Sequence, residues 1–254
     1  MILIVMMNAE NNFEITAEKE LLNYTGRNET VVIPMGVEKI GKQAFYSNKN
    51  IRSVIIPDSV KIIGDSAFKD CANLETVIFS GGLEIIEANA FNYCKSLEFI
   101  EIPEGVKGVG YGAFFQCTSL SSASIPDSVE FMGDYVFWYC KSLKSVRFSK
   151  NIKRIGSNAF AYCYGIKELD LPENLMEIGE RAFSRCKGLK DVKLPHGVKV
   201  IEHHAFEDCN KLRTVKLNEG LEFLGDNAFK GCMKLEPVSL PSTIKIMGEE
   251  VFDK

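Results

Sequence analysis

A phenylalanine recurs every 23 residues from residue 45 to the end of the chain, ten times without an insertion or deletion. An alanine precedes it in eight copies, and all eight cysteines lie three residues after one of these phenylalanines. A fixed period of this length is the signature of stacked structural repeats, in which each repeat packs only on its neighbours. The sequence therefore predicts one elongated domain of about ten 23-residue coils, although 254 residues would otherwise suggest one or two globular domains.

Each repeat is predicted to contain one short strand and one tight turn. After Phe68, apolar residues lead to Val77 and Phe79, which alternate with period 2 as in a β-strand. A proline follows most of these strands, and proline cannot donate to a strand ladder. A glycine precedes the Ala-Phe pair in eight copies, and the segment from this glycine to the cysteine is predicted to be a single helical or 3₁₀ turn. Glu87 and Glu202 fill the glycine slot elsewhere, so the slot does not require a positive φ.

The first 30 residues lack the full repeat. We predict an N-terminal capping segment over residues 1–30 and a solenoid over 31–254, since the terminal coil of a solenoid needs its core covered. The apolar run Met1–Met7 is expected to be a buried edge strand of this cap, with a poor or truncated export signal as the alternative. It is too short to span a membrane. No C-terminal cap is recognisable, so the last coil is expected either to associate end to end with another copy or to fray.

The cysteines are predicted to form a ladder of buried thiols. None are spaced as Cys-x-x-Cys, the spacing of common zinc sites. Equivalent positions on adjacent coils lie about 4.8 Å apart, which is within the range that a disulfide tolerates, so regulated disulfides remain the alternative.

No motif for catalysis, metal binding or phosphate binding is recognisable. The three histidines (His196, His203 and His204) have no Cys, Asp or Glu at a convincing ligand spacing, and the glycines are dispersed along the repeats. The net charge of −4 does not favour nucleic-acid binding. We therefore expect no enzyme activity, no metal and no cofactor.

The strand residues that flank the inward central position are expected to point outward. These outward positions are apolar in the first coils, are serines in the middle and carry mixed charge towards the end. They are either ordinary strand formers and solvated charges, or a contact surface marked by clustered apolar residues. The predicted partner-binding residues of this sheet are Ile55, Ile78, Phe99, Arg147, Glu168, Asp170, Asp191 and Lys193.

A second candidate surface is the loop between the phenylalanine and the cysteine in the middle coils. Neighbouring positions in most other coils are polar, so the repeat does not require aromatic residues there. The residues of this aromatic cluster are Tyr93, Phe115, Trp138, Tyr139, Tyr162 and Tyr164. They either pack on one another or bind a protein or glycan, since Trp and Tyr dominate binding hot spots.

Four successive coils also share a basic residue in one position. These residues are Lys144, Lys167, Lys190 and Arg213. Because Glu168, Asp170 and Asp191 lie beside them, we interpret this row as solvated charge.

The complete pattern, Leu-x-x-Val-x-Leu-Pro-x-x-Val-x-x-Ile-Gly-x-x-Ala-Phe-x-x-Cys, resembles the BspA-type (Treponema-type) leucine-rich repeat family. A near-ideal copy runs from Leu189 to Cys209, with Glu202 in the glycine slot. The resemblance covers residues 31–254 and implies a right-handed, curved leucine-rich-repeat solenoid with a parallel β-sheet on its concave face. It also implies a non-enzymatic protein that binds host or partner proteins, often at a cell surface.

From these observations we expect a protein–protein interaction scaffold. The alternative is a carbohydrate-binding module that uses exposed aromatic residues around Trp138. A protein is the expected partner and a glycan the second possibility, with no nucleic acid. With no recognisable export signal or anchor, the default location is the cytoplasm, although proteins similar to this one are often secreted or displayed on the cell surface.

Overall fold

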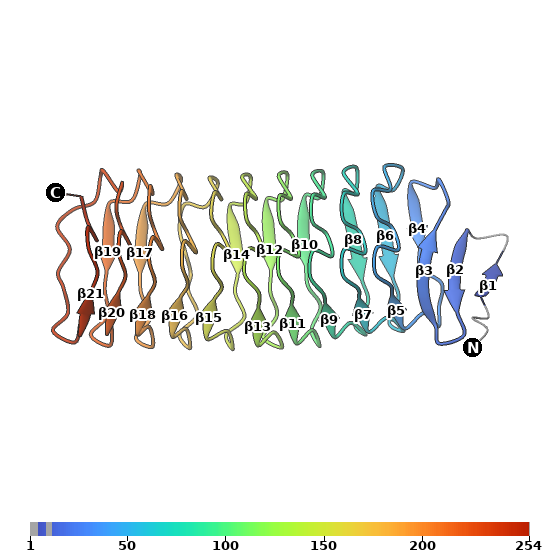
Figure 1. The fold of residues 1–254 in the computed structure, drawn as a ribbon, viewed down its shortest axis with the longest axis horizontal. Helices are drawn as coiled ribbons and strands as arrows, with labels where there is room; N and C mark the ends of the chain where they lie inside the picture. Colours follow the sequence, from blue (N-terminus) through green and yellow to red (C-terminus); the bar gives the residue numbers. More distant parts are fainter. Residues whose placement is uncertain (1–4, 9–11, 254) are drawn as a thin grey trace.

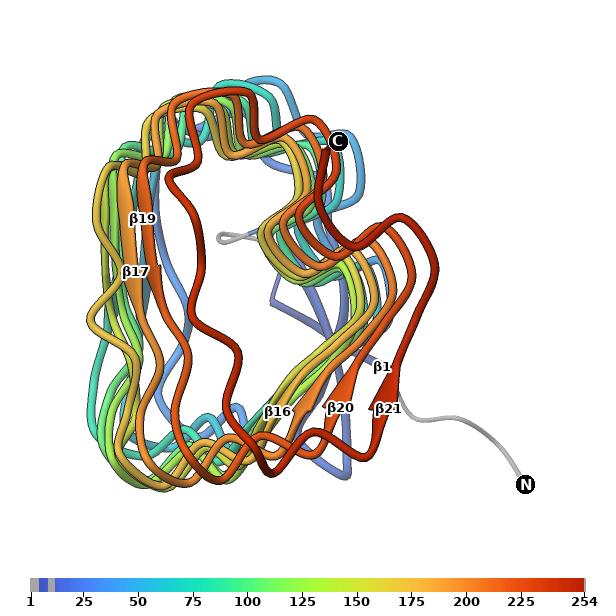
Figure 2. The same cartoon turned by 90° about the vertical axis from the view of Figure 1, so that its left-hand side faces the viewer.

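The chain forms a row of stacked coils (Figure 1). The computed structural model describes the backbone of residues 5–8 and 12–253 and the side chains of residues 12–253. Strands and turns make up the coils, and no helix occurs among the described residues. Seen along the axis, successive coils superpose on a common outline (Figure 2). The predicted β-solenoid of about ten 23-residue coils is therefore confirmed.

The predicted strand is present and forms the long-strand ladder, which is built from strands of three or four residues. Equivalent residues pair in parallel at the 23-residue spacing, as in Val54 with Val77. The strands of the long-strand ladder are β4 (Thr30–Val32), β6 (Ser53–Ile56), β8 (Thr76–Phe79), β10 (Phe99–Glu101), β12 (Ser122–Ser124), β14 (Ser145–Arg147), β17 (Asp191–Lys193) and β19 (Thr214–Lys216).

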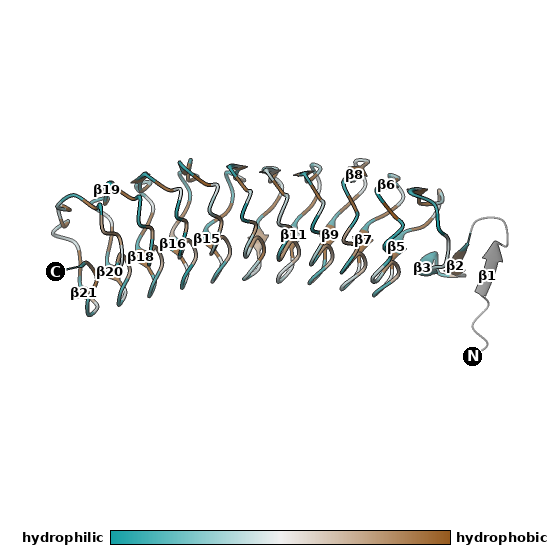
Figure 3. Ribbon diagram, turned by 90° about the horizontal axis from the view of Figure 1, so that it is seen from above, coloured by the Kyte–Doolittle hydropathy of each residue, from teal (hydrophilic) through white to brown (hydrophobic). Residues whose placement is uncertain are grey.

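A second ladder of parallel strands, which the sequence did not predict, lies on another side of the coils. Each coil adds a two-residue strand. Its second residue, such as Ile63 or Ile86, is buried in every coil except the last, where Met247 is exposed. Figure 2 shows β17 and β19 on one side of the outline and β16, β20 and β21 on another, and Figure 3 shows a gently bowed row. The strands of this short-strand ladder are β5 (Lys39–Ile40), β7 (Ile62–Ile63), β9 (Ile85–Ile86), β11 (Gly108–Val109), β13 (Phe131–Met132), β15 (Arg154–Ile155), β16 (Glu177–Ile178), β18 (Val200–Ile201), β20 (Phe223–Leu224) and β21 (Ile246–Met247).

The turn after each short strand is not the predicted helical or 3₁₀ turn. Two residues in each of the first nine copies have a left-handed backbone, such as Ser66 (φ 57°) and Asp70 (φ 61°), whereas a 3₁₀ helix needs consecutive right-handed residues. Along the turn, successive backbone amides alternate between two kinds of hydrogen bond. One donates to a carbonyl within the same turn, and the next donates to a carbonyl of the following coil. The amide of Cys71 donates to the Phe68 carbonyl at 3.1 Å, and the amide of Phe68 donates to the Ala90 carbonyl at 2.7 Å. The turn therefore forms part of the bonding between coils.

In the coils that carry a glycine at the start of this turn, the glycine packs closely against the preceding coil. A Cβ on Gly133 would lie 2.7 Å from the backbone nitrogen of Tyr111 in the preceding coil. Its φ is not in the left-handed region, in agreement with the sequence interpretation.

Two ladders of equivalent side chains fill the core. Successive rings from Phe45 to Phe252 stack with centroids 4.7–5.5 Å apart and interplanar angles of 1–17°. All eight cysteines are buried and free, and each thiol donates to the carbonyl of the phenylalanine 26 residues earlier at 3.0–3.2 Å. The predicted burial of the cysteine ladder is confirmed.

The first strands are antiparallel and continue the short-strand ladder. β1 (Val5–Asn8) pairs with β2 (Phe13–Thr16), β2 pairs with β3 (Glu20–Tyr24), and β3 runs parallel to β5. β1 is the edge strand of this sheet, while residues 1–4 of the apolar run lie outside the described residues. Tyr24 extends the phenylalanine stack, with its ring 5.2 Å from that of Phe45. The division into a cap over residues 1–30 and a solenoid over 31–254 stays a prediction.

Two further observations bear on the ends of the row and on membranes. The last coil carries exposed apolar residues, among them Met233 and Met247, and its self-association stays a prediction.

Within the described residues, no helix has the length and apolar character needed to span a bilayer.

Candidate functional site

A hollow of about 840 Å³ lies on the outward face of β10, β12 and β14. Its floor is made of serines, because three of the six outward positions of these strands are Ser122, Ser124 and Ser145. These short side chains leave space between the larger side chains at the two ends of the hollow. We call this hollow, with its extension described next, the sheet groove.

The sheet groove continues towards the N-terminal coils as a second hollow of about 380 Å³. The two hollows share Phe99, Glu101, Ser124 and Arg147, so together they form one depression. Ile78 and Phe99 form its apolar end, and 48% and 46% of their respective surfaces are exposed. An apolar end with this much free surface is typical of a contact site.

The far wall of the sheet groove arises because one coil leaves the long-strand ladder. After β14 the next coil contributes only an isolated bridge between Glu168 and Asp191, and the following strand is β17. In Figure 2 a yellow coil bulges outward on this side of the outline. Asp170, Leu171 and Glu173 from this coil line the groove.

The charges at this end of the groove are mixed and partly paired. Arg147 Nη2 lies 3.8 Å from Asp127 Oδ1, and Lys150 Nζ lies 3.1 Å from Asp127 Oδ2. The backbone amide of Lys150 also donates to Asp127 Oδ1 at 3.0 Å, and this hydrogen bond lowers the pKa of the Asp127 carboxyl. Serine hydroxyls, one guanidinium and the carboxylates of Glu101, Asp170 and Glu173 equip the groove to bind polar as well as apolar groups.

The structure brings half of the predicted sheet residues together. Ile78, Phe99, Arg147 and Asp170 line the groove, while Ile55 is half-buried one coil before Ile78. The exposed residues Glu168, Asp191 and Lys193 lie outside the groove lining. The serine floor and the wall from the displaced coil were missed. The serines were visible in the sequence, but the displaced coil has no recognisable signal in it.

The aromatic cluster is a continuous contact network of half-buried rings. Phe115 and Trp138 stack at 4.6 Å with an interplanar angle of 11°, and Tyr162 meets Trp138 edge-on at 5.2 Å. Tyr93 lies 5.8 Å from Phe115, and Tyr139 lies within 6.0 Å of Trp138, Tyr162 and Tyr164. None of these six residues lines the sheet groove, so the two candidate sites are separate surfaces.

The tyrosines of this cluster carry backbone strain. Tyr93, Tyr139 and Tyr162 occupy the second position after the phenylalanine, with φ values of 61°, 58° and 63°. A left-handed backbone costs a residue other than glycine roughly 1–3 kcal/mol, and Asp and Asn tolerate it better than Tyr. This position is therefore constrained by the fold, and the three tyrosines remain there in spite of that cost.

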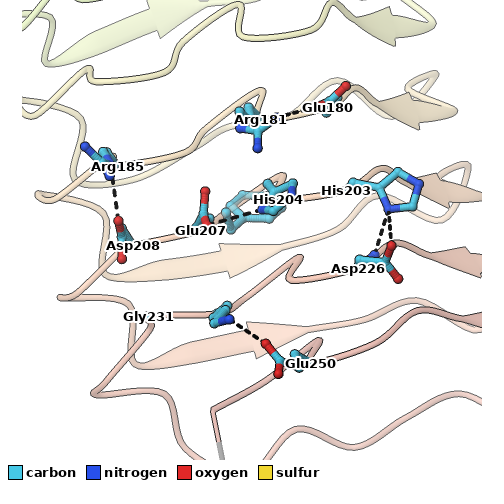
Figure 4. Close-up of polar contacts among 12 residues, drawn as sticks. Glu180, Arg181, Arg185, His203, His204, Glu207, Asp208, Asp226, Gly231 and Glu250 are labelled. Atoms are coloured by element: carbon cyan, nitrogen blue, oxygen red, sulfur yellow. Dashed lines mark hydrogen bonds and ion pairs between the residues drawn. The ribbon is translucent and has the colours of Figure 1, made fainter.

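His203, His204 and the cysteines make contacts within the fold. His203 Nδ1 accepts the backbone amide of Asp226 at 3.0 Å, and His204 Nδ1 lies 3.2 Å from Glu207 Oε1 (Figure 4). No group of three or more metal-ligating side chains occurs in the part of the chain that the structure describes. Burial raises the pKa of the Cys71 and Cys186 thiols to about 12, which keeps them protonated at neutral pH.

The family and fold comparisons agree with this architecture. The profile of the BspA type leucine rich repeat region matches residues 16–144 and 131–254. The crystal structure of the leucine rich repeat protein of T. pallidum is similar at 26% identity and a TM-score of 0.53, over 91% of each chain. The pneumococcal vaccine antigen PcpA is similar at 21% identity and a TM-score of 0.49, over 85% of this chain and 73% of that one.

A leucine rich cell surface protein from Faecalibacterium prausnitzii is similar at 20% identity and a TM-score of 0.39, over 93% of this chain and 94% of that one. A comparison with curated proteins found no match.

Proposed function

Because the chain belongs to the BspA-type leucine-rich repeat family, we propose that it is a protein-interaction scaffold whose partner docks in the sheet groove. The observation that carries this proposal is the groove itself, with exposed Ile78 and Phe99 at one end and Arg147 and Asp170 at the other. A rigid ladder presents these side chains at fixed spacing, so little ordering is needed on binding.

The proposed contact has the anatomy of a protein interface. Phe99 supplies an aromatic anchor, Arg147 supplies a charged group that favours bidentate hydrogen bonds, and the serine floor accepts a protruding side chain from the partner. The volume of about 840 Å³ is large enough for several side chains of a partner segment.

A matched pair of variants tests the groove. Phe99→Ser removes the exposed ring in the groove, and Phe131→Ser removes a ring that is 61% exposed on the short-strand ladder. Each protein is immobilised as bait against an extract of the source cells and against host extracellular-matrix proteins, and captured proteins are quantified by mass spectrometry. We expect a partner that is retained by wild type and by Phe131→Ser and lost with Phe99→Ser.

The same experiment has a clear contrary result. A specific partner that Phe99→Ser retains in full while Phe131→Ser releases it places the interface on the other ladder and refutes the groove assignment. A partner captured from the extracellular-matrix proteins is a host protein. A partner captured from the extract of the source cells is a protein of those cells.

The carbohydrate-binding alternative stays a prediction with less support. One face of the Trp138 ring is taken by Phe115, which leaves less free ring surface for a sugar. Saturable binding on a glycan array that disappears in Trp138→Ala would favour this alternative.

A further inference from the structure

The loop face that carries the aromatic cluster has an unusual charge distribution. In five successive coils, the segments 91–98, 114–121, 137–144, 160–167 and 183–190 contain a single acidic residue, Glu98 in the first of them, although the whole chain has a net charge of −4. The same segments contain all six residues of the aromatic cluster. Their cations are Lys95, Lys141, Lys144, Lys167, Arg185, Lys187 and Lys190. We call this surface the basic aromatic band.

The five segments are held side by side by hydrogen bonds between coils. The amide of Tyr93 donates to the Phe115 carbonyl, that of Gln116 to Trp138, that of Tyr139 to Ala161, and that of Tyr162 to Ser184, all at 2.8–2.9 Å. With about 4.8 Å between strands of adjacent coils, the band is about 19 Å long. It is therefore one continuous surface.

The cations of the band are free to meet a ligand. All seven are exposed, and only Arg185 forms an ion pair among the described residues, with Asp208 at 3.1 Å. Three of them lie over tyrosine rings of the cluster. Lys95 is 5.7 Å from the centroid of Tyr93, Arg185 is 5.3 Å from that of Tyr162, and Lys187 is 5.6 Å from that of Tyr164. Positive charge and aromatic surface therefore alternate along the band.

Acidic residues bound the band at both ends. The equivalent segment of the preceding coil contains Asp70 and Glu75, and that of the following coil contains Glu207 and Asp208. The interpretation of the row Lys144, Lys167, Lys190 and Arg213 as solvated charge considered only the acidic residues of the long-strand ladder. It did not consider the surface on the other side of that row, where Glu98 is the one acidic residue in the five segments.

We propose that the basic aromatic band binds an acidic segment of a partner protein in which acidic and apolar side chains are mixed. The unpaired cations complement the acidic side chains, and the edges of the aromatic rings complement the apolar ones. This inference deepens the proposed function, because it rests on the partner being a protein, but it uses a surface separate from the sheet groove.

Other polyanions fit the band less well. Single-stranded nucleic acid binds by stacking bases on free ring faces, and here Phe115 and Trp138 already stack on each other. A sulfated polysaccharide would match the lysines but would offer no apolar side chains to the aromatic rings. Both become outcomes of the test.

The probe is a fluorescein-labelled peptide of about twelve residues that alternates aspartate with leucine and, fully extended, is longer than the band. Fluorescence anisotropy measures its binding to the full chain at low and at physiological salt. We expect saturable binding that weakens as salt rises, because exposed charge pairs are screened. The double variant Lys141→Glu, Lys187→Glu is expected to bind about tenfold more weakly, since two attractions are lost and two repulsions are added.

The matched control is Lys107→Glu, Lys153→Glu, which changes the net charge equally at exposed positions next to the short-strand ladder. It should bind the peptide within about twofold of wild type, because the screening length is about 8–10 Å. Equal weakening in both double variants would show non-specific attraction and overturn the proposal. Tight binding of heparin or oligothymidylate without binding of the peptide would overturn it as well.

A groove variant separates this proposal from the proposed function. Phe99→Ser should bind the peptide as wild type does. If Phe99→Ser loses the natural partner while wild type does not bind the peptide, the groove assignment holds and the band proposal fails. The opposite result is also possible. If the lysine variants weaken peptide binding and Phe99→Ser keeps every natural partner, the band proposal is supported and the groove assignment is refuted.

Discussion

Replacement of Phe137 by alanine removes one ring from the centre of the phenylalanine stack. Phe137 is fully buried, and the rings of Phe114 and Phe160 lie 5.3 Å from it on either side. Loss of a buried phenylalanine costs about 3–5 kcal/mol. We expect the upper half of this range, because two aromatic contacts are lost and each is worth about 0.5–1.5 kcal/mol.

The surrounding coils have little freedom to close the resulting cavity. The amide of Phe137 donates to the Ala159 carbonyl at 2.8 Å, and the amide of Phe114 donates to the Val136 carbonyl at 2.9 Å. These hydrogen bonds fix the separation of the coils, so the neighbouring rings stay in place. A cavity that does not collapse carries the larger cost.

Urea unfolding measures this loss, with Trp138 as a local fluorescence probe, since it is the only tryptophan of the chain. With an m-value of about 3 kcal/mol/M, a loss of about 4 kcal/mol lowers the midpoint by more than 1 M. Phe99→Ala removes the same atoms from a ring that is 46% exposed and should cost clearly less. Equal losses for Phe137→Ala and Phe99→Ala would refute the account of the stack as the main stabilising element.

Two other substitutions test the packing of the coils and the buried thiols. Gly133→Ala should lower the free energy of unfolding by about 1–3 kcal/mol, because the new Cβ would lie 2.7 Å from the Tyr111 nitrogen. In the control Gly108→Ala the new Cβ would lie 3.8 Å from the Phe131 ring, an ordinary contact distance. Thermal unfolding of this control should show a neutral or slightly stabilising effect. Burial raises the pKa of Cys186 to about 12, so the native state keeps a proton that the unfolded thiol loses above about pH 8.5, and stability falls as pH rises towards 12. Cys186→Ala should flatten that slope by up to about 1.4 kcal/mol per pH unit in urea unfolding between pH 9 and 11, and an unchanged slope would contradict the raised pKa.

The core could be read from the sequence because each core side chain repeats at one position. Phe68, Cys71 and Val77 are buried in the coil as their recurrence predicts. The short-strand ladder was missed because two residues per coil, such as Ile62 and Ile63, are too few to show an alternating pattern. Their pairing depends on the stacking of whole coils and is not a local preference.

The left-handed positions of the turn did leave a signal. The position two residues before the phenylalanine is Asn89, Gly112, Asn158 and Asn227 in four coils, and these residue types favour positive φ. The prediction of a 3₁₀ turn followed the shortness of the segment and overlooked this preference.

The candidate surfaces were only partly predictable. The aromatic cluster was found because its residues depart from the polar character of the same positions in other coils. The sheet groove also depends on the coil around Asp170 leaving the ladder, which no residue pattern indicated. The basic aromatic band was overlooked because charges were compared along one row only, rather than over the whole loop face.

The separation of the two surfaces has a consequence for binding. A partner that reaches both the sheet groove and the basic aromatic band would gain from the second contact as an intramolecular event. Removing either surface would then lower the affinity for the whole partner. This loss would be larger than the loss of affinity measured for a fragment of the partner that contacts that surface alone.

Hydroxyl-radical footprinting of the complex with the captured partner tests the central claim most directly, because it reports the exposure of individual side chains. Phe99 and Phe131 are both accessible in the free chain and lie on different ladders. The account predicts that the partner protects Phe99 and Ile78 from oxidation and leaves Phe131 and Ile85 unchanged. Protection of Phe131 and Ile85 with no change at Phe99 would contradict it.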